Sequence, residues 1–315
     1  MDGSPPGAGT DRLSRAAFED LRRRLGGLAP SGNPARGALA RVTPAHVLAA
    51  AAEVRAGRQV GLGAAVATER TPGNPDPARH PMTGAIAGRM PDEGLDFARD
   101  RVEMNVHGDV DSHLDALCHV VYDGTLYGGV PADTLTDAGA EALAVTAAAD
   151  GIVGRGVLLD IPRLRGVPWL EPGEFVTAGD LLAAEEAQGV RFGEGDLLFV
   201  RVGHRRRWRE LGPWEAAETR AGLHPEAVTL LAERRIAVLG GDGNNDCAPT
   251  LVDGVGFPVH VLAIHDLGLH LLDYLDFEGL APLCAAEGRW SFLCVIAPLR
   301  LRGGTGCPVN PIAVL

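Results

Sequence analysis

The chain has 315 residues, of which 46% are hydrophobic and 22% are charged, a composition typical of a globular protein. Its net charge of −12 and its sequence pI of about 5.3 argue against nucleic acid or an anionic membrane as the main partner. No window of about 20 apolar residues is present, so the sequence predicts no transmembrane span. We therefore expect a globular protein that binds neither nucleic acid nor a membrane.

The sequence has five cysteines, an odd number, and none of them forms a Cys-x-x-Cys pair. This usage is typical of buried thiols in a reduced compartment, so it predicts a cytoplasmic protein and no disulfide framework. The first ten residues contain neither a basic segment nor an apolar one, so we expect a disordered tail there and not a signal peptide.

The N-terminal part predicts an arm that precedes the main domain. Apolar residues at helical spacing predict an amphipathic helix over residues 11–26. Residues 1–42 as a whole are expected to be a disordered tail plus a helical arm. Thr43 and Pro44 then form a helix start, with Thr43 as N-cap, and open a domain predicted to span residues 43–315.

The rest of the chain alternates between patterns typical of strands and patterns typical of helices. Residues 68–101 lack periodicity and predict a long loop that acts as a lid or binding loop. Without an internal repeat or a clean linker, one α/β domain with a mixed sheet flanked by helices is predicted. The expected strands are 59–65, 101–106, 156–161, 196–202, 236–239 and 290–299, and the expected helices are 43–56, 138–149, 177–188 and 225–234.

Residues 107–119 concentrate potential metal ligands, because they hold three of the ten histidines and three carboxylates. If the first part is extended, alternate side chains point to the same face. Burying so many charges without a counter-ion costs several kcal/mol or more, and a bound divalent cation removes that cost. The side chains that would share this face are His107, Asp109, Asp111, His113 and Asp115.

The strongest local signal is the spacing of three residues within this stretch. His113 and Asp115, two residues apart on a strand, can both reach one metal ion, and His119 could return to the site after a turn. A hydrogen-bonded polar turn is the alternative interpretation. Downstream, Asp242 and Asp246 follow a predicted strand, where they could orient a ligand histidine or simply shape a turn.

These residues resemble the motif of the cyclase family of metal-dependent hydrolases, which includes bacterial kynurenine formamidase and isatin hydrolase. The family motif is His-x-Gly-Thr-His-x-Asp-Ala-Pro-x-His, and residues 109–119 read Asp-Val-Asp-Ser-His-Leu-Asp-Ala-Leu-Cys-His. His113, Asp115 and His119 match at the same spacing. A serine replaces Thr, a leucine replaces Pro, and Asp109 stands in the place of the first histidine.

The resemblance covers about residues 45–315 and is looser after the first motif. It implies a swivelling β/β/α cyclase-like fold, one divalent metal ion (Mn²⁺ or Zn²⁺) and a homodimer or homotetramer. It also implies hydrolysis of an amide, lactam or similar bond. The later segments that resemble the family are 195–201, 239–246, 258–260, 271–275 and 303–308.

Carried over by position, the resemblance implies that His113 and Asp115 are metal ligands and that His119 is the catalytic base or acid. It places His260 near the metal, where it takes part in catalysis, and Asp273 where the family has a glutamate.

The identity of the third ligand stays open at this point. Asp109 has the position of the missing histidine, and a carboxylate there would shift the preference toward a harder ion such as Mn²⁺. His107, two residues earlier on the same face, has the more fitting chemistry. A degraded metal site is the third possibility.

The predicted function is hydrolysis of an amide, N-formyl or lactam bond in a small aryl substrate, as in the kynurenine formamidase-like amidohydrolases. A metal-activated water would be the nucleophile and His119 the general base and acid. One alternative is a natural-product cyclase or dehydratase that uses the metal as a Lewis acid. Another is a metal-free binding protein on the same fold, for which the missing first histidine argues.

Overall fold

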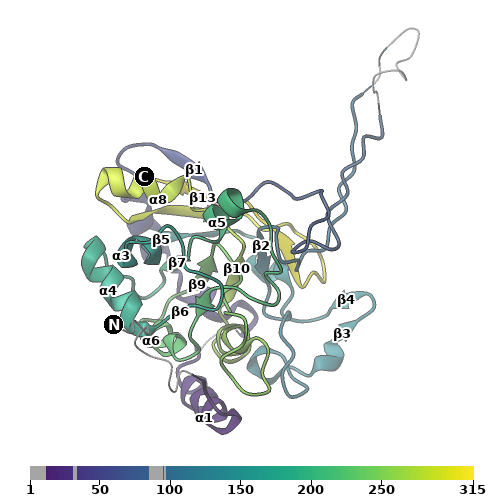
Figure 1. The fold of residues 1–315 in the computed structure, drawn as a ribbon. Helices are drawn as coiled ribbons and strands as arrows, with labels where there is room; N and C mark the ends of the chain where they lie inside the picture. The colour runs from purple at the N-terminus through teal and green to yellow at the C-terminus, as the bar shows by residue number, and fades with distance from the viewer. Residues whose placement is uncertain (1–11, 31–33, 85–94, 96) are drawn as a thin grey trace, which may run out of the picture.

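The computed structural model describes residues 12–30, 34–84, 95 and 97–315, with a mixed sheet at its centre (Figure 1). Within these residues, nine strands form the sheet in the order β1-β13-β11-β5-β7-β9-β10-β2-β12. Strands β5, β7, β9 and β10 run parallel, and the other pairs are antiparallel. Their bounds are β1 Gln59–Gly61, β2 His113–Asp115, β5 Ile152–Asp160, β7 Leu197–Arg201, β9 Val238–Gly241, β10 His270–Asp273, β11 Ser291–Ile296, β12 Gly306–Pro308 and β13 Ile312–Val314.

Helices flank this sheet. Helix α2 contacts β5 and β11, and α3, α4 and α6 gather on one side of the view in Figure 1. None of the helices in the described ranges has the length and apolar character that crossing a bilayer requires. The helices are α1 Arg15–Gly26, α2 Pro44–Ala51, α3 Ile161–Arg165, α4 Ala178–Gln188, α5 His204–Leu211, α6 Ala227–Glu233, α7 Pro258–His260 and α8 Leu280–Glu287.

Smaller elements complete the fold. Two short two-stranded sheets pair β3 (Leu135–Thr136) with β4 (Gly139–Ala140) and β6 (Phe175–Val176) with β8 (Gly222–Leu223). The 3₁₀ turns span Pro34–Arg41, Tyr127–Gly129, Ala132–Thr134 and Val145–Ala148, and a π-helical turn spans Val261–Asp266. The π-helical turn follows α7 directly, so it continues the segment that carries His260.

Local sequence signals explain why several elements form where they do. Strand β7 is an unbroken apolar run up to its last residue, and every position is buried, as expected for an interior strand covered on both faces. Helix α4 begins with a capping box, in which the hydroxyl of Thr177 accepts the N–H of Asp180 while the carboxylate of Asp180 accepts the N–H of Thr177. Gly189 ends it with a left-handed φ of 62°.

The predicted arm helix is α1, and it lies against the body of the protein. Its apolar side chains Phe18, Leu21 and Leu25 are buried, and the helix contacts the π-helical turn after α7. Burial of this apolar face fixes α1 beside the segment that carries His260. The predicted disordered tail lies outside the described residues.

Two predicted elements are wrong. The Ala-rich stretch 138–149 is not a helix but contains β4 and a 3₁₀ turn, because its backbone pairs with the C-terminal loop: the N–H of Ala140 donates to the carbonyl of Gly303. Residues 101–106 form no strand, and only isolated bridges such as Arg79 with Glu103 join this segment to residues 79–82. These two segments lie side by side and extend away from the body (Figure 1).

The mixed α/β sheet flanked by helices that the sequence predicts is confirmed. Its topology brings β2 between β10 and β12, both of which come much later in the chain. The ligand-rich stretch is therefore held in the sheet by antiparallel neighbours on both sides.

A buried ion-pair network at the end of β7 gives a stability prediction. Arg201 pairs with Asp160 and Glu278 at 2.9 Å each, and it is only 6% exposed. Replacing Arg201 with Ala should lower the free energy of unfolding by about 3–5 kcal/mol, because it leaves the buried carboxylate of Asp160 and the partly buried one of Glu278 without a counter-charge. Urea denaturation followed by circular dichroism measures this change. Arg206→Ala, which breaks an exposed pair with Glu210, should cost less than about 1 kcal/mol, and equal losses would contradict the prediction.

Candidate metal centre and active site

The register between β2 and β10 places three potential ligands on one face of the sheet. His113 lies directly opposite Asp273, and Asp115 lies two residues further along β2, so all three side chains point the same way. Their ligand atoms lie within 4.8 Å of one another, and all three residues are buried. The near-absence of solvent means that these carboxylates depend on the neighbouring groups for compensation of their charge.

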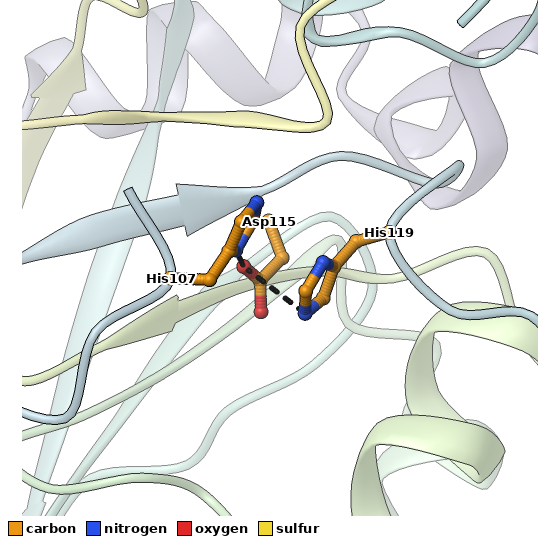
Figure 2. A group of neighbouring side chains, drawn as sticks. All are labelled: His107, Asp115 and His119. Atoms are coloured by element: carbon orange, nitrogen blue, oxygen red, sulfur yellow. Dashed lines mark hydrogen bonds and ion pairs between the residues drawn. The ribbon is translucent and has the colours of Figure 1, made fainter. Parts of the chain in front are cut away.

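A second cluster shares Asp115 with the first. The ligand atoms of His107, Asp115 and His119 also lie within 4.8 Å of one another. The Nδ1 atom of His107 is 2.8 Å from Oδ1 of Asp115, and the Nε2 atom of His119 is 3.9 Å from the same oxygen. Figure 2 shows the carboxylate of Asp115 pointing toward both imidazole rings, which stack with their centroids 3.8 Å apart. Asp115 is thus common to both clusters.

His260 faces both clusters and is held in place by Asp246. The carboxylate of Asp246 accepts the backbone N–H groups of Val259 and His260 and lies 2.6 Å from Nδ1 of the His260 ring. The other ring nitrogen, Nε2, is 3.4 Å from carboxylate oxygens of both Asp115 and Asp273. Asp246 therefore fixes the orientation of the ring that is turned toward the site.

Two neighbouring amides orient Asp273, and sequence reasoning did not single them out. Asn244 donates from Nδ2 to one oxygen of Asp273 at 2.9 Å, and Asn245 donates to the other oxygen. Both come from the Gly-Asp-Gly-Asn-Asn-Asp loop after β9. That polar loop was the available signal, but the pairing of its amides with Asp273 depends on the tertiary structure.

The charged groups of the site shift one another's pKa values. Burial by itself would raise the pKa of Asp115, but His119, His107 and the other surrounding histidines hold it well below its usual range. Burial lowers the pKa of His119 to about 4, a shift that the charge of Asp115 only partly offsets. Burial also opposes ionisation of His260, yet the carboxylates of Asp273, Asp115 and Asp246 raise its pKa well above the usual value. His119 is therefore neutral at pH 7 and able to accept a proton.

The donor set fits a divalent metal ion. The Oδ2 atom of Asp115 is buried and accepts no hydrogen bond, although Nε2 of His260 lies 3.4 Å away. A buried carboxylate oxygen without a donor is costly, and a metal ion satisfies it. The Nδ1 atom of His113 lies 2.8 Å from the carbonyl oxygen of Asp111 and donates to it, which leaves Nε2 for a metal. Imidazole and carboxylate are the ligands that zinc and manganese prefer.

The structure separates the two candidates for the third ligand. His107 contacts Asp115 directly, whereas the carboxylate of Asp109 accepts a hydrogen bond from the hydroxyl of Tyr274 at 2.9 Å and joins neither cluster. The expected single extended face is wrong, because only the segment from His113 to Asp115 is a strand and residues 107–112 form turns and bends.

The two downstream aspartates behave differently. Asp246 contacts His260, as described above, while Asp242 accepts the backbone N–H groups of Val202 and Gly203 at 2.7 and 2.8 Å. Burial raises the pKa of Asp242 to about 6. In this structure Asp242 shapes the turn between β7 and α5.

A cavity of about 530 Å³ opens over the site. Its lining includes all four site histidines together with Asp109 and Asp273, and it also includes apolar residues. Among the apolar residues, Phe257 and Val121 are 48% and 47% exposed, so they offer uncovered apolar surface. None of the described residues of the predicted binding loop, 68–101, lines it. The apolar and aromatic lining residues are Val120, Val121, Tyr122, Val255, Phe257 and Val261.

Asp246 offers a test of how the site is held. Replacing Asp246 with Asn should lower metal affinity or turnover by about 10–100-fold, because Asn keeps the size of the side chain but loses the charge that orients His260. Metal titration and steady-state kinetics measure the two effects. Asp253→Asn is the control, since Asp253 lies on the same loop but pairs with Arg12 at the surface. Unchanged affinity and turnover in the Asp246 variant would contradict this role.

Comparison with known proteins agrees with this architecture. The family described as "Putative cyclase" matches residues 62–245. A solved structure described as a novel cyclase is 30% identical, with 89% of this chain and 94% of that chain covered and a TM-score of 0.80. No curated protein matches this sequence.

Two isatin hydrolases share the fold at lower identity. Isatin hydrolase A from Labrenzia aggregata is 21% identical over 81% of this chain and 93% of its own, with a TM-score of 0.57. Isatin hydrolase A from Ralstonia solanacearum is 22% identical over 81% of this chain and 91% of its own, with a TM-score of 0.55. The family match covers more than half of the chain and agrees with the family predicted from the sequence. The chain belongs to the cyclase family.

Proposed function

We propose that the protein is a metal-dependent hydrolase of an amide, N-formyl or lactam bond in a small aryl substrate. The observation that carries this proposal is Asp115, which is fully buried, is shared by two ligand clusters and keeps one oxygen without a hydrogen bond. The isatin hydrolases that share the fold act on a lactam, and this activity supports the choice of bond.

The ion would be held by His113, Asp115 and Asp273, and His260 lies beside them. His107 contacts the carboxylate of Asp115 as a member of the second cluster. A bound Mn²⁺ or Zn²⁺ would supply Lewis acidity and a water of lowered pKa. The chain itself has to bind the substrate, orient its carbonyl group and move protons.

His119 is placed to move the proton. Its ring lines the cavity and is neutral at pH 7, because burial lowers its pKa to about 4. It takes a proton from the attacking water at Nε2 and gives that proton to the leaving nitrogen. His260, held at Nδ1 by Asp246, turns its Nε2 toward the site and is placed to contact the oxyanion that develops on the carbonyl.

The apolar lining of the cavity supports an aryl substrate. Phe257 and Val121 present exposed apolar surface in the same cavity as the site histidines. An aromatic ring bound in this cavity would cover apolar surface beside the polar groups of the site, as in other mostly apolar ligand sites.

The first test is the metal content of protein purified without an affinity tag, measured by mass spectrometry. Wild-type protein and the surface variant His80→Ala should carry about one equivalent of Mn or Zn, and His113→Ala should carry none. Chelator should abolish hydrolysis of N-formyl arylamines or isatin, and added metal should restore it. Protein that binds no Mn²⁺ or Zn²⁺ when these ions are offered would contradict the proposal.

Solvent ¹⁸O distinguishes hydrolysis from a Lewis-acid cyclisation or dehydration at the same site. Incorporation of ¹⁸O into the product is expected. A product formed without ¹⁸O would assign the site to cyclase or dehydratase chemistry instead.

A further inference from the structure

Asp109 is a cavity residue that the metal clusters leave unused. It stands where the family motif has a histidine, yet its ligand atoms belong to neither group of neighbouring ligands. It is half-buried and lines the cavity above the site. Its carboxylate is therefore available to a bound molecule.

The position of this carboxylate is fixed through one of its oxygens. The hydroxyl of Tyr274 donates to Oδ1 of Asp109, and Tyr274 is fully buried at the end of β10. The backbone of Tyr274 is itself held, because its N–H donates to Gly243 and its carbonyl accepts from the hydroxyl of Ser112 and from Arg205. A side chain anchored to a rigid element in this way is preorganised for recognition.

The remaining hydrogen-bonding capacity of Asp109 has no partner in the protein. An ionised carboxylate accepts about four hydrogen bonds, and within the described residues Asp109 accepts only the one from Tyr274 and forms no ion pair. The described residues that line the cavity include no arginine and no lysine. A divalent ion at Asp115 and Asp273 would leave the charge of Asp109 uncompensated.

We infer that Asp109 is a specificity-determining residue that accepts a hydrogen bond from an N–H group of the substrate. This inference rests on the proposed function and narrows its substrate class to amides and lactams that keep a free N–H. Compounds that are N-alkylated, or that carry an anionic group facing Asp109, are disfavoured. Neither an N-methyl group nor an anion can donate to the free oxygen of the carboxylate.

A matched pair of probes tests this inference: isatin, a lactam with a ring N–H, and N-methylisatin, which lacks it. Wild-type protein should favour isatin by about 10–100-fold in kcat/KM or in binding affinity, as expected for a hydrogen bond to a charged group. In Asp109→Ala this preference should fall to within about threefold. Tyr274→Phe, which removes only the anchoring hydroxyl, should give an intermediate preference.

Metal content by mass spectrometry is measured for each variant, and both Asp109→Ala and Tyr274→Phe should keep the wild-type amount. Loss of metal in Asp109→Ala would overturn the inference, because it would make Asp109 a ligand. An equal fall in kcat/KM or in affinity for both probes would also overturn the inference, because a purely structural role of Asp109 affects both probes alike.

Calorimetric binding of the two probes to metal-loaded protein separates this inference from the proposed function. If the protein binds isatin in preference to N-methylisatin through Asp109 but hydrolyses neither these probes nor N-formyl arylamines, the proposed function fails and the recognition by Asp109 stands. If it hydrolyses both probes and the ratio of their kcat/KM values is the same in wild type and in Asp109→Ala, the function stands and the inference is overturned. Failure to bind either probe overturns the inference, while hydrolysis of N-formyl arylamines still decides the proposed function.

Discussion

Replacing Asp115 with Asn should abolish metal binding and lower turnover by on the order of 10³-fold or more. The neutral amide of Asn is a poorer metal ligand than a carboxylate, and Asp115 belongs to both clusters. A metal that stabilises the transition state by several kcal/mol accounts for a rate factor of this size. The change keeps the size and shape of the side chain, so the surrounding packing is retained. Mass spectrometry of the metal content and steady-state kinetics give the two readouts.

Asp242→Asn is the matched control for this variant. Asp242 is as fully buried as Asp115, but it accepts hydrogen bonds from the backbone between β7 and α5 and contacts neither cluster. It should keep its metal. If both variants lose the ion and also melt early in thermal denaturation, the loss reports unfolding and not removal of a ligand. Full metal content in the Asp115 variant would refute the assignment of the site.

The second large effect concerns the proton carrier. His119→Gln should lower kcat by about 10²–10⁴-fold while the metal stays bound. Glutamine keeps hydrogen-bonding capacity but cannot accept and return a proton. The cluster of His113, Asp115 and Asp273 does not depend on His119, so metal content should match the wild type.

His265→Gln serves as the comparison, because His265 contacts Arg22, Thr125 and Asp266 and does not line the cavity. Its kcat should stay close to that of the wild type. Loss of metal in His119→Gln would make His119 a ligand beside His107 and Asp115. Undiminished kcat with metal in place would remove it from the mechanism.

Local sequence patterns were sufficient to predict those helices and strands that interactions between neighbouring residues determine. The helix predicted over residues 177–188 and the strand predicted over 196–202 are confirmed within a few residues as α4 and β7, because a helix cap and an unbroken apolar run specify them locally. The spacing of His113 and Asp115 placed them on one face because the strand period is two. The Ala-rich stretch 138–149 failed because helix propensity is weak, and its pairing with the C-terminal loop overrides it.

The site shows where sequence reasoning reaches its limit. The choice between Asp109 and His107 depends on the path of residues 107–112, which form turns and bends instead of an extended strand. Nothing in the local sequence sets that path. The hydrogen bonds of Tyr274 with Asp109 and of Asn244 with Asp273 join segments that are distant in the sequence. They depend on the order of the strands in the sheet, which only the complete fold determines.

The place of β2 in the sheet has a consequence for how the protein reaches its native state. Both neighbours of β2 come from the last quarter of the chain, so its ligands cannot meet Asp273 until almost the whole polypeptide has been synthesised. Contacts so distant in sequence form slowly, because a long loop must close before they contribute any stability. An ion that binds only the completed site adds about 2.7 kcal/mol of stability at 100 times its dissociation constant. If the proposed metal binds, its supply during biosynthesis should therefore raise the yield of folded protein as well as its later activity.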